Sequence, residues 1–267
     1  MNLSQTFVLG DKLTKEQLAF FEEFGFVHFT NFLDPQQIAH NLQAIKEVEQ
    51  KWIANDVAKV NGIPIKYGKD ENGKRIVQRF AFASLDSEVL HEFINDKRLL
   101  VLKQFIGKVS RIAEYEKDGL VINHYVNTEV SNFTKLGWHT DCLRDMFQGL
   151  HIDPMINVGV SLDDSPKEKG GLRVIPCSHK QGLYDLLFRK KYFVDNRPDK
   201  EEFALETKAG DLTVHSGRLW HRVALSQHKG AASKRRVMYF PIISGKYKPK
   251  NGKSWTPIYL KFQKVVR

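Results

Sequence analysis

The sequence predicts a mainly β protein with flanking helices, an α+β fold whose β part is an antiparallel sandwich or jelly roll. Helical patterns and one hairpin occupy the first 119 residues. From residue 120 onward the chain consists of short apolar or alternating runs separated by Gly, Pro, Asp and Lys-rich turns. The 267 residues are 42% hydrophobic, with no long polar tract, which is enough for one sizeable core. We therefore expect a single domain over residues 1–267.

The first elements are a helix and a short strand. Thr14 and Gln17 have the spacing of a capping box, and Gly25 is a typical helix stop. Residues 26–29 are apolar enough to form a strand. Asp34 as an N-cap and Pro35 at the first helical position then predict a second, longer amphipathic helix.

A hairpin and a third helical segment complete the N-terminal part. Asn72 and Gly73 lie between two strand-like arms, which is the strongest short hairpin signal in the chain. The turn GKDENGKR resembles a phosphate-binding loop, but Arg75 stands where Ser or Thr is needed, so we interpret it as a hairpin turn. Residues 87–109 have a helical pattern.

The remaining chain supplies the strands of the expected jelly roll. Five runs carry the signal: LVINHYV, INVGVSL, GLRVIP, DLTVHS and RRVMYFPII. We divide the domain into a helical part with a hairpin (1–119), a jelly-roll core (120–245) and a C-terminal extension (246–267). The segment 184–203 is long for a connection and could cover a site.

Composition restricts the location and the partners. Cys142 and Cys177 are too few for a disulfide framework or a four-thiolate zinc site. No apolar run is long enough to span a membrane, and the N-terminus lacks a signal-peptide pattern, so we expect a cytoplasmic protein. The net charge of +10 favours anionic partners and leaves peripheral membrane contact open. A nucleic-acid partner is disfavoured because aromatic residues do not interleave with a basic groove.

Two HxD triplets compete as metal ligands. His139 with Asp141 and His151 with Asp153 have the same spacing, which places both side chains on one face of a strand. A second His would complete a set of two imidazoles and one carboxylate, which suits Fe(II). His215 and His221 both qualify from the residues alone. Further on, Arg235 and Arg236 are candidates for gripping a carboxylate.

Four ordered blocks resemble the phytanoyl-CoA dioxygenase family of iron and 2-oxoglutarate oxygenases. These are LTKEQLAFFEEFGFVHFTNFLDPQQI, GWHTD, INVGVSLDDSPKEKGGLRVIPCSHKQG, and AGDLTVHSGRLWHRVALS followed by KRRV. Cys177 departs from the family, which usually has Gly there. The resemblance implies a double-stranded β-helix (jelly-roll, cupin-like) core with the N-terminal helices packed on one sheet.

The resemblance also implies roles for individual residues. It favours His139 and Asp141 over the second triplet, and His221 over His215, as ligands of Fe(II). It places the 2-oxoglutarate anchor at Arg235, and Arg236 is the alternative if the alignment with the family is shifted by one residue. Other contacts to the cosubstrate are implied on the strand before the triplet and within it, at Asn123, Tyr125 and Thr140.

The implied activity is hydroxylation of an unactivated C–H bond of a small anionic metabolite, with O2 and 2-oxoglutarate consumed and succinate and CO2 released. Asp141 favours hydroxylation, since related halogenases lack this carboxylate. An acyl-CoA, a lipid-linked acidic sugar or a nucleic acid stays open as an alternative substrate. A noncatalytic jelly-roll binding protein with a vestigial metal site is the alternative from another class.

Overall fold

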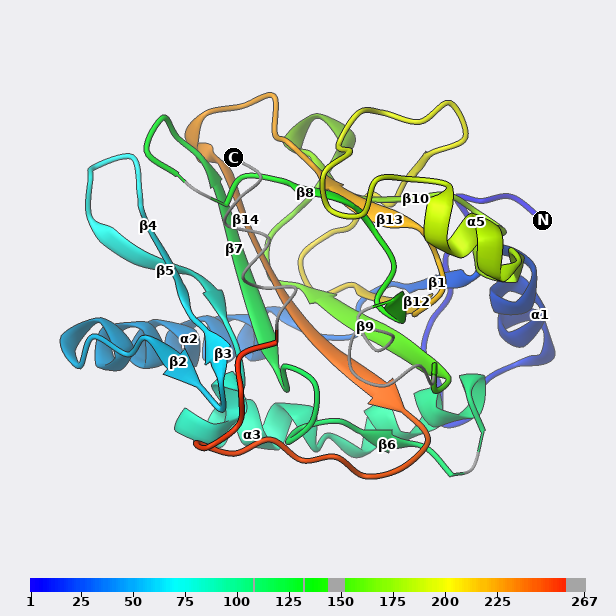
Figure 1. Cartoon of the computed structure of the whole chain (residues 1–267), viewed down its shortest axis with the longest axis horizontal. Coiled ribbons are helices and arrows are strands. Elements are labelled where there is room, and N and C mark those ends of the chain that lie inside the picture. The colour runs from blue at the N-terminus through cyan, green and yellow to red at the C-terminus, as the bar shows by residue number, and fades with distance from the viewer. Residues whose placement is uncertain (108, 132, 144–151, 258–267) are drawn as a thin grey trace.

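The chain folds into two antiparallel sheets with helices against one of them (Figure 1). The structure, a computed structural model, describes residues 1–107, 109–131, 133–143 and 152–257. The predicted mainly β fold with flanking helices is confirmed, and neither sheet closes into a barrel.

The N-terminal helices begin and end where their caps predict. In α1 (Lys15–Phe24), the Thr14 side chain accepts a hydrogen bond from the Gln17 backbone, and the Gln17 side chain accepts one from the Thr14 backbone. Gly25, in the left-handed conformation, ends the helix before β1 (Phe26–Phe29). The longer α2 (Pro35–Ala54) has a second capping box, which is built on Asp34.

The hairpin and the third helical segment follow. The Asn72-Gly73 turn joins β4 (Lys66–Lys69) to β5 (Arg75–Phe80), as predicted. The expected helix over 87–109 is instead two pieces, α3 (Glu88–Ile94) and the 3-10 helix η2 (Lys97–Phe105). Asp96 accounts for the break, because its side chain accepts a hydrogen bond from the Arg98 backbone and starts the second piece. The short elements here are β2 (Lys59–Val60), β3 (Ile63–Pro64) and η1 (Ala83–Asp86).

The larger sheet has eight strands, in the order β1-β12-β9-β14-β7-β5-β4, with β6 paired to β14. Its further strands are β6 (Arg111–Ile112), β7 (Val121–Asn127), β9 (Met155–Ser161), β12 (Leu212–Ser216) and β14 (Gly230–Ile243). The smaller sheet has the order β11-β10-β13-β8. It contains β8 (Leu136–His139), β10 (Gly171–Val174), β11 (Phe203–Ala204) and β13 (His221–Ala224). Between strands lie η3 (Lys167–Lys169), η4 (Ser178–Lys180) and α5 (Leu183–Phe188).

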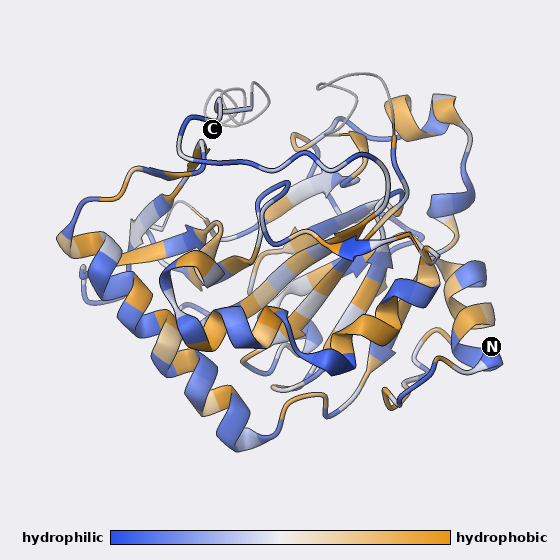
Figure 2. Cartoon of the chain, turned by 90° about the horizontal axis from the view of Figure 1, so that it is seen from below, coloured by the Kyte–Doolittle hydropathy of each residue, from blue (hydrophilic) through white to orange (hydrophobic). Residues whose placement is uncertain are grey.

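Helices α2 and α3 lie across the outer face of the larger sheet (Figure 2). The side chains on that face belong to the main buried hydrophobic cluster. The Trp52 ring of α2 lies 5.4 Å from the Phe80 ring, and the Phe93 ring of α3 lies 6.1 Å from the Phe240 ring. Paired residues on this face form continuous apolar rows, because directly opposed residues in an antiparallel sheet share a face. One such row is Phe80, Ile122, Met238, Val160, Leu212 and Phe29.

The inner face of the same sheet is polar. Successive side chains alternate between faces, so the inner rows carry polar or charged residues between the apolar ones. These rows include Arg79, Asn123, Val237 and Ser161, and then Pro241, Asn157, His215 and Phe26. The inner face therefore has the side chains that a site requires.

One buried hydrophobic cluster contains residues from both the helical part and the sheets. The division at residues 119 and 245 stays a prediction. No helix in the described part of the chain is long and apolar enough to cross a membrane.

Candidate metal centre

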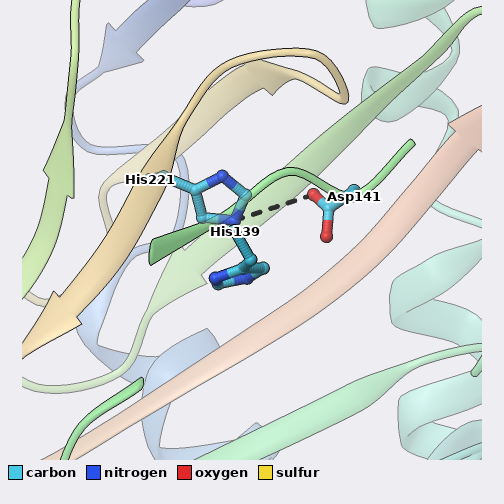
Figure 3. Close-up of side chains that lie close together, drawn as sticks. All are labelled: His139, Asp141 and His221. Carbon is cyan, nitrogen blue, oxygen red and sulfur yellow. Dashed lines mark ion pairs between the residues drawn. The ribbon is translucent and has the colours of Figure 1, made fainter. Parts of the chain in front are cut away.

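Three predicted ligands come together between the two sheets. His139 is the last residue of β8, Asp141 follows two residues later, and His221 is the first residue of β13. The register of the smaller sheet pairs His221 directly with His139. One donor atom from each of the three residues lies within 4.8 Å of the others (Figure 3). Local sequence order and strand pairing thus produce a compact group of two imidazoles and one carboxylate.

Backbone carbonyls set the protonation of both imidazoles. His139 Nδ1 lies 2.8 Å from the Gly137 carbonyl oxygen, and His221 Nδ1 lies 2.9 Å from the Leu219 carbonyl oxygen. Because a carbonyl can only accept, each Nδ1 is the donor, and Nε2 is left with the lone pair that a metal requires. Burial, together with the neighbouring His139 and His215, lowers the pKa of His221, which favours the neutral imidazole.

Asp141 is held in its ionised form by its neighbours. Burial alone would raise its pKa, but the imidazoles of His221, His215 and His139 outweigh this and hold the pKa well below its usual range. Asn157 Nδ2 donates to Asp141 Oδ2 over 3.1 Å. His221 Nε2 lies 3.8 Å from the same oxygen, the contact dashed in Figure 3. The carboxylate is therefore charged and oriented before any metal binds.

The competing ligand candidates have different positions. His215, on β12, places Nε2 3.3 Å from Asp141 Oδ2, so it borders the site but is outside the group of three. His151 lies outside the described residues. The Asp153 carboxylate lies beside Gly245, away from the three ligands.

Adjacent arginines of β14 point to opposite faces of the larger sheet. Arg235 is opposite Tyr125, and its guanidinium carbon lies 5.0 Å from the centre of the Tyr125 ring. It is 2% exposed, and its Nε has no hydrogen-bond partner among the described residues. Arg236 instead makes a bidentate ion pair with Asp163, at 2.7 and 2.8 Å. Of these two arginines, Arg235 is the one that is buried with a donor left unused among the described residues.

A cavity of about 120 Å³ extends from the ligands along the inner face. Asn123 and Tyr125 line it, as predicted for contacts of the site. Thr140 is not among the lining residues; its hydroxyl lies 3.7 Å from the Cys142 sulfur. The cavity is smaller than the ~300–1,000 Å³ of a pocket for a drug-sized ligand, which favours a small substrate.

Residues 189–203, here called the covering segment, lie over the metal ligands. The Phe193 ring stacks on the His139 ring, with centroids 4.5 Å apart. Trp138 of β8 accepts a backbone hydrogen bond from Phe193 and donates one to Asp195. The Tyr192 hydroxyl donates to the Thr140 carbonyl oxygen over 2.8 Å. The segment expected to cover a site was 184–203, and the contacts of Tyr192, Phe193 and Asp195 agree with this for part of that segment.

Several residues of the site were not among the sequence candidates. Asn157 is a polar residue within a mostly apolar strand, and this signal could have identified it. Phe193, Lys66 and Arg79 line the cavity without any local motif. Their positions depend on contacts between distant segments, which the sequence alone does not reveal.

Comparisons with known proteins agree with the geometry. The model of the family described as phytanoyl-CoA dioxygenase (PhyH) matches residues 21–224. A probable alpha-ketoglutarate-dependent hypophosphite dioxygenase from Stutzerimonas stutzeri is 21% identical over 162 residues, or 60% of this chain and 52% of that protein. This chain therefore spans about half the length of that curated relative.

Two solved structures share the fold. The epimerase SnoN, in complex with Fe3+, alpha ketoglutarate and nogalamycin RO, is 18% identical with a TM-score of 0.63, covering 91% of this chain and 92% of that one. The non-heme alpha ketoglutarate dependent carbocyclase SnoK from nogalamycin biosynthesis is 17% identical with a TM-score of 0.64, covering 97% and 94%. With most of its length matched by the family model, the chain belongs to the phytanoyl-CoA dioxygenase family, as its four sequence blocks indicate.

Proposed function

We propose that this protein is an Fe(II)- and 2-oxoglutarate-dependent dioxygenase that hydroxylates an unactivated C–H bond of a small anionic molecule, with release of succinate and CO2. The observation that carries the proposal is a group of three side chains beside a cavity: one ionised carboxylate and two imidazoles that are oriented by backbone carbonyls. Family membership supports the same chemistry.

The donor set fits the proposed metal. Two imidazoles whose Nδ1 atoms donate to backbone carbonyls, together with one carboxylate, form the set that binds non-haem Fe(II) and leaves positions for other ligands. His139, Asp141 and His221 would hold the ion. When bound, iron would supply the activation of O2, and 2-oxoglutarate would supply two of the four electrons that O2 takes up, the substrate C–H bond providing the other two.

Arg235 would bind the distal carboxylate of 2-oxoglutarate. A buried guanidinium is costly unless a hydrogen-bonded anion compensates it. Arg235 has an unused Nε, and Ala224 accepts from its Nη2 over 3.2 Å. A carboxylate would complete this bonding. Asn123 and Tyr125 line the cavity and would contact the cosubstrate, whereas the role of Thr140 rests on the sequence resemblance.

Asp141 supports the transfer of oxygen, rather than halogen, to carbon. Its carboxylate would occupy the position on the metal that a halide takes in related halogenases. Hydroxylation is proposed over the epimerisation and carbocyclisation named for SnoN and SnoK, since those proteins share the fold at only 17–18% identity. The hypophosphite dioxygenase relative is consistent with a small anionic substrate.

Anaerobic titration with Fe(II) and 2-oxoglutarate tests the proposal. We expect a visible charge-transfer band that is lost in His139→Ala and kept in His151→Ala. Succinate release with a screen of small anions then separates catalysis from binding. A band without succinate release for any substrate would favour the noncatalytic binding protein, and no band in the wild type would contradict the metal assignment.

A further inference from the structure

Two side chains of the larger sheet approach one oxygen of the Asp141 carboxylate. Asn157 of β9 donates from Nδ2 to Asp141 Oδ2 over 3.1 Å, and His215 of β12 places Nε2 3.3 Å from the same oxygen. Asp141 itself lies two residues beyond the end of β8, so strand pairing within the smaller sheet does not orient its side chain. The larger sheet therefore supplies two nitrogen atoms beside a proposed metal ligand.

Strand register places Asn157 and His215 side by side. The two residues are directly paired between β9 and β12, and directly opposed residues of an antiparallel sheet have their side chains on the same face. Both side chains line the cavity. His139 and His221 come instead from the smaller sheet. The contacts of Asn157 and His215 with Asp141 therefore connect the two sheets at the proposed metal centre.

His215 is a buried imidazole with unused bonding capacity. Its side chain is 1% exposed, and neither ring nitrogen has a hydrogen-bond partner among the described residues. Its partner on the other neighbouring strand, Phe26 of β1, is apolar. A buried polar group without a hydrogen bond is costly, so such a group calls for an explanation. A proton on Nε2 would face the ionised carboxylate of Asp141, which is the favourable arrangement for this ring.

We infer that His215 is a positioning residue of the metal centre: its Nε2 carries a proton directed at Asp141 Oδ2, and together with Asn157 it holds this carboxylate in the orientation for binding the metal. This inference rests on the proposed function and adds a residue outside the three ligands. The tautomer is opposite to that of His139 and His221, whose Nδ1 atoms donate to backbone carbonyls. Side chains that hold a ligating carboxylate in this way fix its direction.

Histidine NMR of the metal-free protein tests the tautomer. Long-range proton–nitrogen correlations distinguish a protonated Nδ1 from a protonated Nε2, and His215→Gln identifies the His215 signals by their loss. We expect a protonated Nε2 in His215 and a protonated Nδ1 in His139 and His221. Asp141→Asn should shift the Nε2 signal of His215. A His215 ring without a proton on Nε2 would overturn the inference.

Calorimetric titration of the metal-free protein with Co(II) tests the effect on metal binding. His215→Leu should raise the Kd for Co(II) about tenfold or more, as is typical when a side chain that supports a metal ligand is removed. His215→Gln should largely restore the affinity, because its amide nitrogen takes the place of Nε2. His215→Asn should bind as weakly as His215→Leu, because its shorter amide reaches only the place of Nδ1.

Thr213→Val is the matched control. Thr213 is buried on the same strand, two residues away and on the same face, but its hydroxyl donates to the Gly159 carbonyl oxygen. This variant should bind Co(II) like the wild type. Urea unfolding identifies any variant that does not fold, and if His215→Leu fails, the comparison of His215→Gln with His215→Asn decides. A Kd that is equal in these two variants, or unchanged in His215→Leu, would contradict the positioning role.

A failure of the proposed function is distinguishable from a failure of this inference. If the proposed function is wrong, the charge-transfer band is missing in the wild type, yet the protonated Nε2 of His215 and its dependence on Asp141 persist in the metal-free protein. If only this inference is wrong, the band is present, and His215→Leu binds Co(II) like the wild type.

Discussion

Glu202 compensates two buried guanidinium groups, and its neutralisation should be strongly destabilising. Its carboxylate accepts from Arg222 Nη2 and Nε at 2.7 and 2.8 Å, and Arg173 Nε lies 4.0 Å away. The Arg222 and Arg173 side chains are 7% and 6% exposed. Because Glu202→Gln leaves both cations without this carboxylate, it incurs the cost of an uncompensated buried charge.

The neighbouring residue provides the control. Glu201 pairs with Arg189 at 2.6 Å but is 57% exposed, and exposed pairs contribute only ~0–1 kcal/mol. Removing one partner of a buried pair costs ~3–5 kcal/mol. Glu202 is itself 16% exposed, so we expect the lower end, about 3 kcal/mol, for Glu202→Gln. Glu201→Gln should lose at most about 1 kcal/mol.

Urea unfolding followed by tryptophan fluorescence measures the difference. With a slope of about 3 kcal/mol per molar urea, the midpoint of Glu202→Gln should fall by about 1 M. Glu201→Gln should change it by no more than about a third of that. If both variants lost the same small amount, the guanidinium groups would be adequately solvated without Glu202, and the reasoning would be refuted.

Three further outcomes are expected. Arg235→Met should weaken 2-oxoglutarate binding about a hundredfold in a spectroscopic titration, because two charge-assisted hydrogen bonds are lost. Arg236→Met should leave that binding intact and instead lower the free energy of unfolding measured in urea. Burial, followed by the charge of Arg236, lowers the pKa of His124 to about 4. The unfolded chain then binds more protons than the folded protein between about pH 4 and pH 6.5, so the free energy of unfolding decreases as the pH falls through this range. His124→Gln should remove about 2 kcal/mol of that loss at about pH 5 in urea unfolding, and an unchanged pH dependence would contradict this. A Cβ at Gly137 would lie 2.3 Å from a backbone oxygen of the covering segment, whereas Gly182 has open space, so Gly137→Ala should cost about 1–3 kcal/mol and Gly182→Ala much less. Equal effects of the two alanines would contradict the contact.

The elements that the sequence predicted are those that local chemistry determines. The caps at Thr14 and Asp34 and the Asn72-Gly73 turn each act within a few residues, so their signals are complete in the sequence. The break before η2 was missed, because Asp96 is a weak signal inside a helical pattern. The strands from residue 120 onward were recognisable from their alternation.

Only part of the candidate site could be predicted from the sequence. The choice of His221 over His215 came from resemblance, and both imidazoles lie beside Asp141, so local pattern could not separate them. Strand register decides which arginine faces inward, and register is a property of the sheet. Phe193 comes from a segment without regular structure, and its place over His139 depends on backbone bonds to an edge strand.

The same alternation that builds the core also builds the site. In β14, Val237 and Tyr239 share the inner face with Arg235, while Met238 and Phe240 pack outward against helices. A shift of one residue would turn Arg235 toward the apolar outer face and expose Met238 and Phe240 to the cavity, which is costly on both faces. The hydrophobic pairing with α2 and α3 therefore fixes the register that points Arg235 inward. The proposed cosubstrate anchor is thus positioned by core packing on the opposite side of the sheet, which explains why a site of a few polar residues can be held precisely without a local motif of its own.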